Sequence, residues 1–178
     1  MHTRILIAFL LLACTFVRNG LAQQYPSRHF TTLDGLPNNA IRSLYLDSRG
    51  LLWIGTENGL SKMENNIFQN FDEDDGLAFN SCWAIAEDSL GQMWFGSYGG
   101  GISYYDGRFF HTLDSKEGLI NDFIREIYYF DDKIWVGTIN GLSAIDIRTK
   151  EIISLESSLS DSPQAYISGF FVQEGLLH

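Results

Sequence analysis

Three residues at one recurring position have the chemistry to hold a ligand. Arg42 and Arg125 occupy the same place in two units of an internal repeat, and the unit between them carries Trp83 there. A guanidinium donates paired hydrogen bonds to anions, and an indole ring stacks on flat apolar groups. A repeat position whose chemistry varies is not fixed by packing alone. Arg42, Trp83 and Arg125 are therefore candidate ligand-binding residues.

Polar residues near the ends of the repeat units form a second group of candidates. Asn38, Asn80 and Asn121 recur on the loops between units, and Tyr98 lies in a turn that we expect on the same face. Binding residues often lie on loops that a rigid scaffold supports. The alternative role is structural, because asparagine side chains also hydrogen-bond the backbone of turns and strand ends. We favour that structural role for the three asparagines.

Catalytic chemistry is not indicated by the sequence. It contains no glycine-rich phosphate loop, no cysteine and histidine cluster with metal-ligand spacing, and no Gly-x-Ser-x-Gly motif. The acidic run at residues 72–75 suggests calcium, but it lacks the alternating ligand spacing and the final glutamate of a calcium loop. We favour a solvated acidic turn there. We expect no enzymatic activity, no cofactor and no metal site in this chain.

The units are defined by a repeat of about 41 residues, in which a tryptophan is followed two positions later by glycine. These residues are Trp53, Trp94 and Trp135, with Gly55, Gly96 and Gly137. Turn residues divide each unit into four short strands, which is the pattern of a β-propeller blade. We expect the three tryptophans to be buried between blades, and the glycines to lie where a neighbouring strand or ring approaches. All six are interpreted as structural.

The repeat predicts an all-β, truncated β-propeller with three complete blades and part of a fourth. The predicted segments are an N-terminal strand and lead-in loop at 23–39, blades at 40–71, 72–110 and 111–153, and a partial blade at 154–178. The N-terminal strand would close the ring of an intact propeller. An open ring leaves apolar blade faces in water, so we expect this chain to associate with itself or to aggregate.

Residues 1–22 are predicted to be a signal peptide. Arg4 precedes the apolar run 5–17, and Gly20 and Ala22 are small residues suited to cleavage before Gln23. The run is too short to span a bilayer comfortably, so we expect export with cleavage. A second reading stays open, because residues 11–14 loosely resemble a lipoprotein signal that would place a lipid on Cys14.

The charge and the cysteine content exclude some functions. The formal net charge is −10, and removal of Arg4 and Arg18 with the signal peptide makes it −12. Such a chain repels phosphate backbones, so we expect no nucleic-acid partner. Cys82 is the single cysteine outside the signal peptide, which excludes an intramolecular disulfide. Its apolar strand position favours a packing role.

The segments at 34–41 and 47–60, with sequences DGLPNNAI and DSRGLLWIGTENGL, closely resemble the two-component regulator propeller repeat. The resemblance extends over about residues 28–178. It implies the periplasmic sensor region of a bacterial sensor histidine kinase or hybrid two-component system, at the periplasmic face of the inner membrane of a Gram-negative bacterium.

Several further expectations follow from this resemblance. The parent chain would continue with more blades, an immunoglobulin-like domain, a membrane span and a histidine kinase or, in some relatives, a diguanylate cyclase. It would form a homodimer, bind an oligosaccharide or another small ligand, and feed a phosphorelay. This chain would be an N-terminal fragment without the output domain. The alternatives are a structural or protein-binding propeller and, third, a propeller enzyme.

Overall fold

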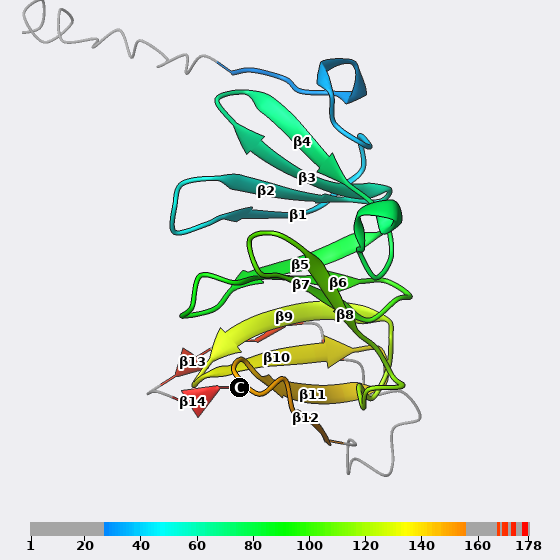
Figure 1. Cartoon of the computed structure of the whole chain (residues 1–178), viewed down its shortest axis with the longest axis vertical. Helices are drawn as coiled ribbons and strands as arrows, with labels where there is room; N and C mark the ends of the chain where they lie inside the picture. Colours follow the sequence, from blue (N-terminus) through cyan, green and yellow to red (C-terminus); the bar gives the residue numbers. More distant parts are fainter. Residues whose placement is uncertain (1–26, 156–166, 168, 171, 174–175, 178) are drawn as a thin grey trace, which may run out of the picture.

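The computed structural model describes residues 27–155, 167, 169–170, 172–173 and 176–177. Three four-stranded antiparallel sheets follow one another along the chain and stack face to face, as Figure 1 shows. In each sheet the strands lie in sequence order, so every connection between two strands of the same sheet is a hairpin. The predicted propeller blades are confirmed. The signal peptide and Cys14 lie outside the described residues.

The three blades have the following strands. Blade 1 contains β1 (Ile41–Leu46), β2 (Leu52–Thr56), β3 (Gly59–Glu64) and β4 (Ile67–Phe71). Blade 2 contains β5 (Cys82–Glu87), β6 (Met93–Ser97), β7 (Ile102–Tyr105) and β8 (Phe110–Leu113). Blade 3 contains β9 (Ile124–Phe130), β10 (Lys133–Thr138), β11 (Gly141–Asp146) and β12 (Ile152–Leu155). A further hairpin pairs β13 (Val172–Gln173) with β14 (Leu176–Leu177).

Two predicted blade boundaries are wrong by a few residues. The boundary at 110/111 cuts through β8, which pairs with β7 as far as Leu113. The end placed at 153 cuts through β12, which pairs with β11 as far as Leu155. These fourth strands are short and contain exposed polar residues, so their alternation of apolar and polar residues is weak.

The predicted N-terminal strand does not appear among the described residues before β1. A 3₁₀ helix, η1 (Thr32–Asp34), lies there instead. The Thr31 side chain accepts a hydrogen bond from the backbone of Leu33, and the Asp34 side chain accepts one from the backbone of Thr31. In this capping box, side chains accept the hydrogen bonds of backbone N–H groups that, in a strand, would donate to a neighbouring strand.

The acidic run at 72–75 forms the same turn in front of blade 2. It contains η2 (Glu73–Asp75), which Asp72 caps by accepting from the backbone of Asp74. Asp75 in turn accepts from the backbone of Asp72. The carboxylates of Asp72 and Asp75 therefore cap a turn, as we expected of an acidic turn rather than of a calcium loop.

The core lies between the blades rather than within one sheet. Trp53, Leu60 and Phe71 of blade 1 pack against Met93 and Phe95 of blade 2. Trp94 and Ile102 of blade 2 pack against Ile134 and Val136 of blade 3 in the same way. Blades 1 and 2 thus each pack their tryptophan-bearing face on the following blade, and blades 2 and 3 each pack the opposite, apolar face on the preceding one.

The repeat glycines lie where consecutive blades come closest. A Cβ atom at Gly55 would lie 2.6 Å from the Cys82 carbonyl oxygen. A Cβ at Gly96 would lie 2.6 Å from Ile124 Cγ2, and one at Gly137 would lie 2.6 Å from Ile167 Cγ2. These distances are too short for any side chain, so glycine is required for the blades to pack this closely.

The expectation of three buried tryptophans is correct for two of them. Trp53 and Trp94 are fully buried, and their indole nitrogens donate to Asp47 at 3.0 Å and Asp88 at 2.8 Å. Trp135 is only half-buried and donates to the Phe130 carbonyl at 3.2 Å. The shortened first turn of blade 3 places Phe130 where the other blades have the buried aspartate.

Candidate functional site

Each blade contains a β-bulge near the start of its first strand. The pairing of β1 with β2, of β5 with β6 and of β9 with β10 shifts register at this point, and one residue of the first strand is skipped. The skipped residues are Arg42, Trp83 and Arg125. A bulge redirects a side chain away from the regular alternation of the sheet. These three of the predicted ligand-binding residues therefore share the same backbone distortion.

These bulges bring the three side chains together. The first strands of neighbouring blades contact one another, so residues about 41 positions apart become neighbours. The Arg42 guanidinium carbon lies 4.8 Å from a ring centroid of Trp83, and that of Arg125 lies 5.4 Å from it. Both distances are those of cation–π contacts. One indole from blade 2 thus interacts with an arginine from the blade on each side.

Tyr98 joins the same group. Its ring is stacked on Trp83 with a centroid separation of 4.4 Å and an interplanar angle of 17°. Phe123 meets the Tyr98 ring edge-on at 5.1 Å, and the backbones of these two residues form an isolated β-bridge. Arg42, Trp83, Tyr98, Phe123 and Arg125 are called the arginine–aromatic cluster below.

Polar contacts orient the two residues that reach the cluster from blades 1 and 2. The Trp83 indole nitrogen donates to Ser81 Oγ at 2.9 Å. Arg42 forms an ion pair through Nε with Glu57, and both side chains are about two-fifths exposed. Glu57 occupies the repeat position of Tyr98. The same pair of positions therefore holds an ion pair in blade 1 and two stacked rings in blade 2.

Sequence reasoning missed Phe79 and Phe123. Phe79 replaces the asparagine that precedes the bulge in blades 1 and 3, and it is 41% exposed. A Cβ atom at Gly99 would lie 3.7 Å from the rings of both phenylalanines, which places Phe79 beside the cluster. The sequence could have predicted Phe79, because a phenylalanine replaces an asparagine at its repeat position. Trp83 was predicted from the same kind of change, a tryptophan in place of an arginine.

The three candidate asparagines form hydrogen bonds within loops. Asn38 accepts from the Ala40 amide at 2.7 Å, and Asn121 accepts from the Phe123 amide at 2.9 Å. Asn80 accepts from the Glu73 amide at 3.0 Å, as Asn39 does from Thr32 at 2.9 Å one repeat earlier. Asn80 is thus equivalent to Asn39 rather than to Asn38. All three side chains thus hydrogen-bond the backbone of their own loops, which is the role that we favoured for them from the sequence.

An acidic cavity of about 320 Å³ lies along the first strands of the three blades. Its lining includes Tyr45, Glu87 and Glu126. Burial raises the pKa of Glu126, although its own backbone contact to the Ile127 amide opposes the shift. Glu126 directly follows the bulged Arg125, so the strand places opposite charges on consecutive residues.

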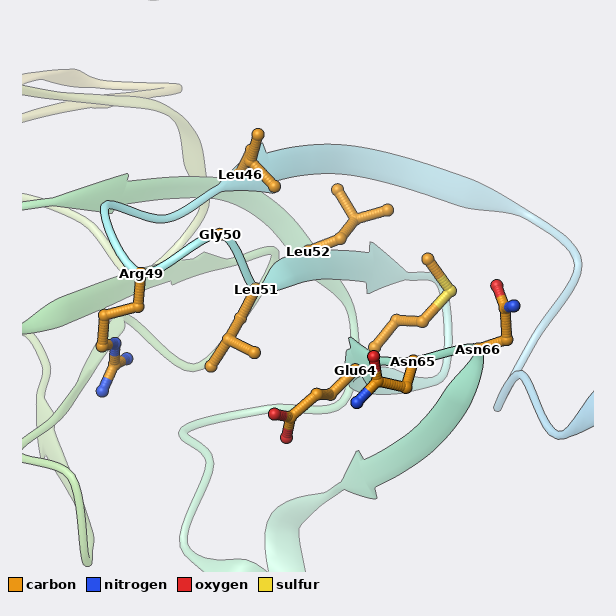
Figure 2. Close-up of a pocket in the computed structure, with 9 residues that line it drawn as sticks. Leu46, Arg49, Gly50, Leu51, Leu52, Glu64, Asn65 and Asn66 are labelled. Carbon is orange, nitrogen blue, oxygen red and sulfur yellow. The ribbon is translucent and has the colours of Figure 1, made fainter.

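Neither the buried cysteine nor the hollow on blade 1 shows the chemistry of a reactive or ligand-binding site. Burial raises the pKa of the Cys82 thiol to about 12, so the residue packs as a neutral, unreactive group. A hollow of about 520 Å³ lies on blade 1 between its two outer hairpin turns, as Figure 2 shows. Leu46, Leu52 and Met63, which are paired in register, line the side of it that faces away from blade 2.

Metal-binding and membrane-spanning features were also sought in the part of the chain that the structure describes. No three His, Cys, Asp or Glu side chains gather there in a way that could hold a metal ion. No helix within those residues is long and apolar enough to cross a membrane.

Comparison with known proteins identifies the repeat. Residues 35–58 and 76–99 match the family described as two component regulator propeller, which confirms the resemblance predicted from the sequence. These segments contain the bulge and the following turn of blades 1 and 2, and therefore Arg42, Glu57, Trp83 and Tyr98. The chain has the fold of a β-propeller, and these two segments are similar to the repeat of this family. A search of curated proteins found no match.

Solved structures with the same fold are extracellular domains from B. thetaiotaomicron. The domain of the hybrid two component system BT3049 is 28% identical, with a TM-score of 0.75 over 88% of this chain and 23% of that one. Two structures of the BT4673 domain, described as a one component and as a hybrid two component system, are each 25% identical. Their TM-scores are 0.68 and 0.65, over 80% of this chain and 22% of theirs. This chain thus spans less than a quarter of their length.

Proposed function

We propose that this chain is the N-terminal part of an extracytoplasmic receptor of a two-component system, and that its blades sense a small ligand. The arginine–aromatic cluster carries this proposal. Its central residues Arg42, Trp83 and Arg125 occupy the bulged position of three consecutive blades, and the chemistry of this position changes from blade to blade. Support for the receptor context comes from the extracellular domains of similar fold.

Ligand binding is tested by thermal denaturation of the whole chain with a panel of defined oligosaccharides, both neutral and acidic. We expect at least one member to raise the melting temperature, because a ligand that binds only the folded state stabilises it. The same ligand should have no effect on Trp83→Ala. A panel without any stabilising member, or an undiminished effect in Trp83→Ala, would contradict a sensory role for the cluster.

The receptor context is tested by the gene downstream of codon 178. We expect further blades, a membrane span and a histidine kinase. An open reading frame that ends after a closed propeller, with no output domain, would favour the structural or protein-binding alternative. Specific support for that alternative comes from the exposed leucines on the outer face of blade 1, Leu44 and Leu46.

Export is tested by mass spectrometry of the protein made in a Gram-negative host. We expect a mature chain that begins at Gln23 and is recovered from the periplasm, since the predicted cleavage site precedes that residue. A chain that retains Met1, or that carries a lipid on Cys14, would contradict this part of the proposal.

A further inference from the structure

We infer that the acidic cavity is a second binding site, for a small organic cation of the quaternary ammonium class. The inference does not depend on the proposed sensory function, because the lining of the cavity shares no residue with the arginine–aromatic cluster. Its lining residues come from β1, β5 and β9, the first strands of three stacked blades (Figure 1). The volume of about 320 Å³ is at the lower end of the range of small-molecule sites, about 300–1,000 Å³.

The charge of the cavity carries the first step. Within the described residues, two carboxylates line the cavity and no lysine, arginine or histidine does. The ion pairs found in that part of the chain contain neither Glu87 nor Glu126. Burial raises the pKa of Glu126, and the contact that opposes this shift is with the Ile127 amide rather than with a cation. A cation bound in the cavity would therefore stabilise the ionised form of Glu126.

Both carboxylates replace uncharged residues of the repeat. Glu126 pairs with the repeat glycine of blade 3, at the position where blades 1 and 2 have Ser43 and Ala84. Glu87 of blade 2 is at the position of Leu46 in blade 1. A repeat position whose chemistry changes between blades is not set by packing alone. Two such changes bring negative charge to the same cavity.

Glu87 is oriented by contacts with blade 1. Its carboxylate accepts hydrogen bonds from the Ser48 amide at 2.7 Å and from the Ser48 hydroxyl at 2.6 Å. These neutral donors fix the carboxylate without removing its charge, and an ionised carboxylate has about four acceptor sites. Burial, and next the charge of Glu87, raise the pKa of the Tyr45 hydroxyl, so this phenol lies close to the carboxylate.

Three tyrosines in the lining determine which cation fits. Tyr45, Tyr128 and Tyr129 line the cavity together with the carboxylates. The Tyr129 hydroxyl donates to Asp132 at 3.2 Å, and the Tyr128 ring lies 6.3 Å from that of Phe170. Aromatic rings attract cations, and quaternary ammonium groups are typically bound by several of them. Calcium and magnesium ions instead need several oxygen ligands, so carboxylates mixed with tyrosines favour the organic cation.

Isothermal titration of the whole chain with choline tests the inference. The matched probe is 3,3-dimethyl-1-butanol, which has the shape of choline without its charge. We expect choline to bind at least tenfold more tightly than this alcohol. Glu126→Gln should weaken choline binding roughly tenfold, because it removes one negative charge from the cavity. Tyr128→Leu should weaken it about twofold to fivefold, because it removes one aromatic ring.

Carbon-13 NMR of the carboxyl groups gives a readout that a purely structural role of Glu126 would not change. Glu126→Gln assigns the resonance. Saturation with choline should lower the pKa of Glu126 towards its ordinary value of 4.5, because a nearby cation favours the charged form. The uncharged alcohol should leave this pKa where it is. Glu151→Gln is the matched control variant, since Glu151 is exposed on the same blade, and it should bind choline as the parent chain does. Circular dichroism of each variant verifies that the fold is retained.

Four results would overturn the inference. Choline that fails to bind, or binds no more tightly than the alcohol, would mean that the cavity does not recognise a cation. Equal weakening by Glu126→Gln and by Glu151→Gln would mean a general attraction to an acidic surface. A pKa of Glu126 that bound choline leaves unchanged would place the ligand elsewhere. Loss of choline binding in Trp83→Ala but not in Glu126→Gln would place it at the arginine–aromatic cluster. The oligosaccharide panel remains the separate test of ligand sensing.

Discussion

At the scale of single residues, buried aspartates hold the repeat tryptophans in place. Asp47 has a fully buried side chain and accepts hydrogen bonds from the amides of Arg49 and Leu51, from the Trp53 indole and from the Arg49 guanidinium. Burial opposes ionisation of this carboxyl, but these donors outweigh burial and lower its pKa. One side chain thus closes the first turn of blade 1 and positions its core tryptophan.

Asp47→Asn tests this role at neutral pH. The amide nitrogen that replaces one carboxylate oxygen cannot accept from its donors, so we expect a loss of about 1–3 kcal/mol in the free energy of unfolding. Urea denaturation measures the loss. Asp131→Asn, in the exposed first turn of blade 3, is the control and should be close to neutral. Equal effects of the two substitutions would contradict the assigned role.

The same variant has a defined pH dependence. The folded-state pKa of Asp47 lies below its ordinary value of 3.8, so the unfolded chain binds more protons as the pH falls. The stabilisation is present above pH 3.8 and is lost as the pH falls through the folded-state pKa. The gap between the parent chain and Asp47→Asn should therefore narrow below pH 3.8 in denaturation curves. A constant gap would show that ionisation is not involved.

The pKa of Glu126 is shifted in the opposite direction to that of Asp47. Its pKa is raised by burial, so its contribution is most favourable below the ordinary value of 4.5 and is lost as the pH rises through the folded-state pKa. Glu126→Gln should raise the melting temperature at pH 7 by about 2 °C, a small shift because the residue is half-exposed. The difference should vanish below pH 4.5. A lower melting temperature for Glu126→Gln at pH 7 would contradict this reading.

At the scale of elements, the glycine of the second strand and the bulge of the first strand shape the contact between neighbouring blades. The glycine of the second strand lets the next blade approach, and the bulge of the first strand turns one side chain out of the sheet pattern. Gly55 illustrates the role of the glycine, because an added Cβ would meet the Cys82 carbonyl and the Ser43 hydroxyl. A backbone oxygen cannot move aside as a flexible side chain can.

Gly55→Ala should therefore destabilise the chain by about 1–3 kcal/mol. Gly169→Ala is the control, since no atom of the described residues lies within 4 Å of its added Cβ and its backbone is not in the left-handed region. Thermal denaturation of the two variants provides the comparison. A melting temperature of Gly55→Ala equal to that of Gly169→Ala would mean that the blades are not held at this distance.

Repetition explains which elements could be predicted from the sequence. The 41-residue spacing of Trp53, Trp94 and Trp135 predicted the blades, and the chemistry of Arg42, Trp83 and Arg125 at one repeat position singled out the central residues of the cluster. The bulge could not be predicted, because it is a one-residue shift in register between strands. Trp135 is half-buried because it lies on the face of blade 3 opposite to the one that packs on blade 2, and no complete four-stranded sheet covers that face among the described residues.

At the scale of the whole molecule, the blades expose unequal faces. Figure 1 shows blades 1, 2 and 3 stacked in sequence order. The apolar face of blade 2 that contains Met93 and Phe95 is buried against blade 1, whereas the equivalent face of blade 1 exposes Leu44 by 63% and Leu46 by 66%. Exposed apolar surface of this kind favours association with a complementary face. The tryptophan-bearing face of a blade is such a complement.

We therefore expect the chain to associate in solution. Multi-angle light scattering should give a mass that exceeds that of the 20.2 kDa monomer and rises with concentration. Leu44→Glu should shift the equilibrium towards monomer, because it places a charge in the apolar face. Leu90→Glu is the control, since Leu90 is exposed to a similar extent but lies in a turn. A concentration-independent monomer in the parent chain would contradict this expectation.

If three consecutive blades build one ligand site around Trp83, as we propose, a bound ligand must change the surroundings of that indole. The chain contains four tryptophans, so incorporation of 5-fluorotryptophan gives four ¹⁹F resonances, and Trp83→Phe assigns the one that matters. During titration with a ligand that stabilises the chain, we expect the Trp83 resonance to shift and those of the buried Trp53 and Trp94 to stay unchanged. A titration that shifts the Trp135 resonance and leaves Trp83 unmoved would contradict it.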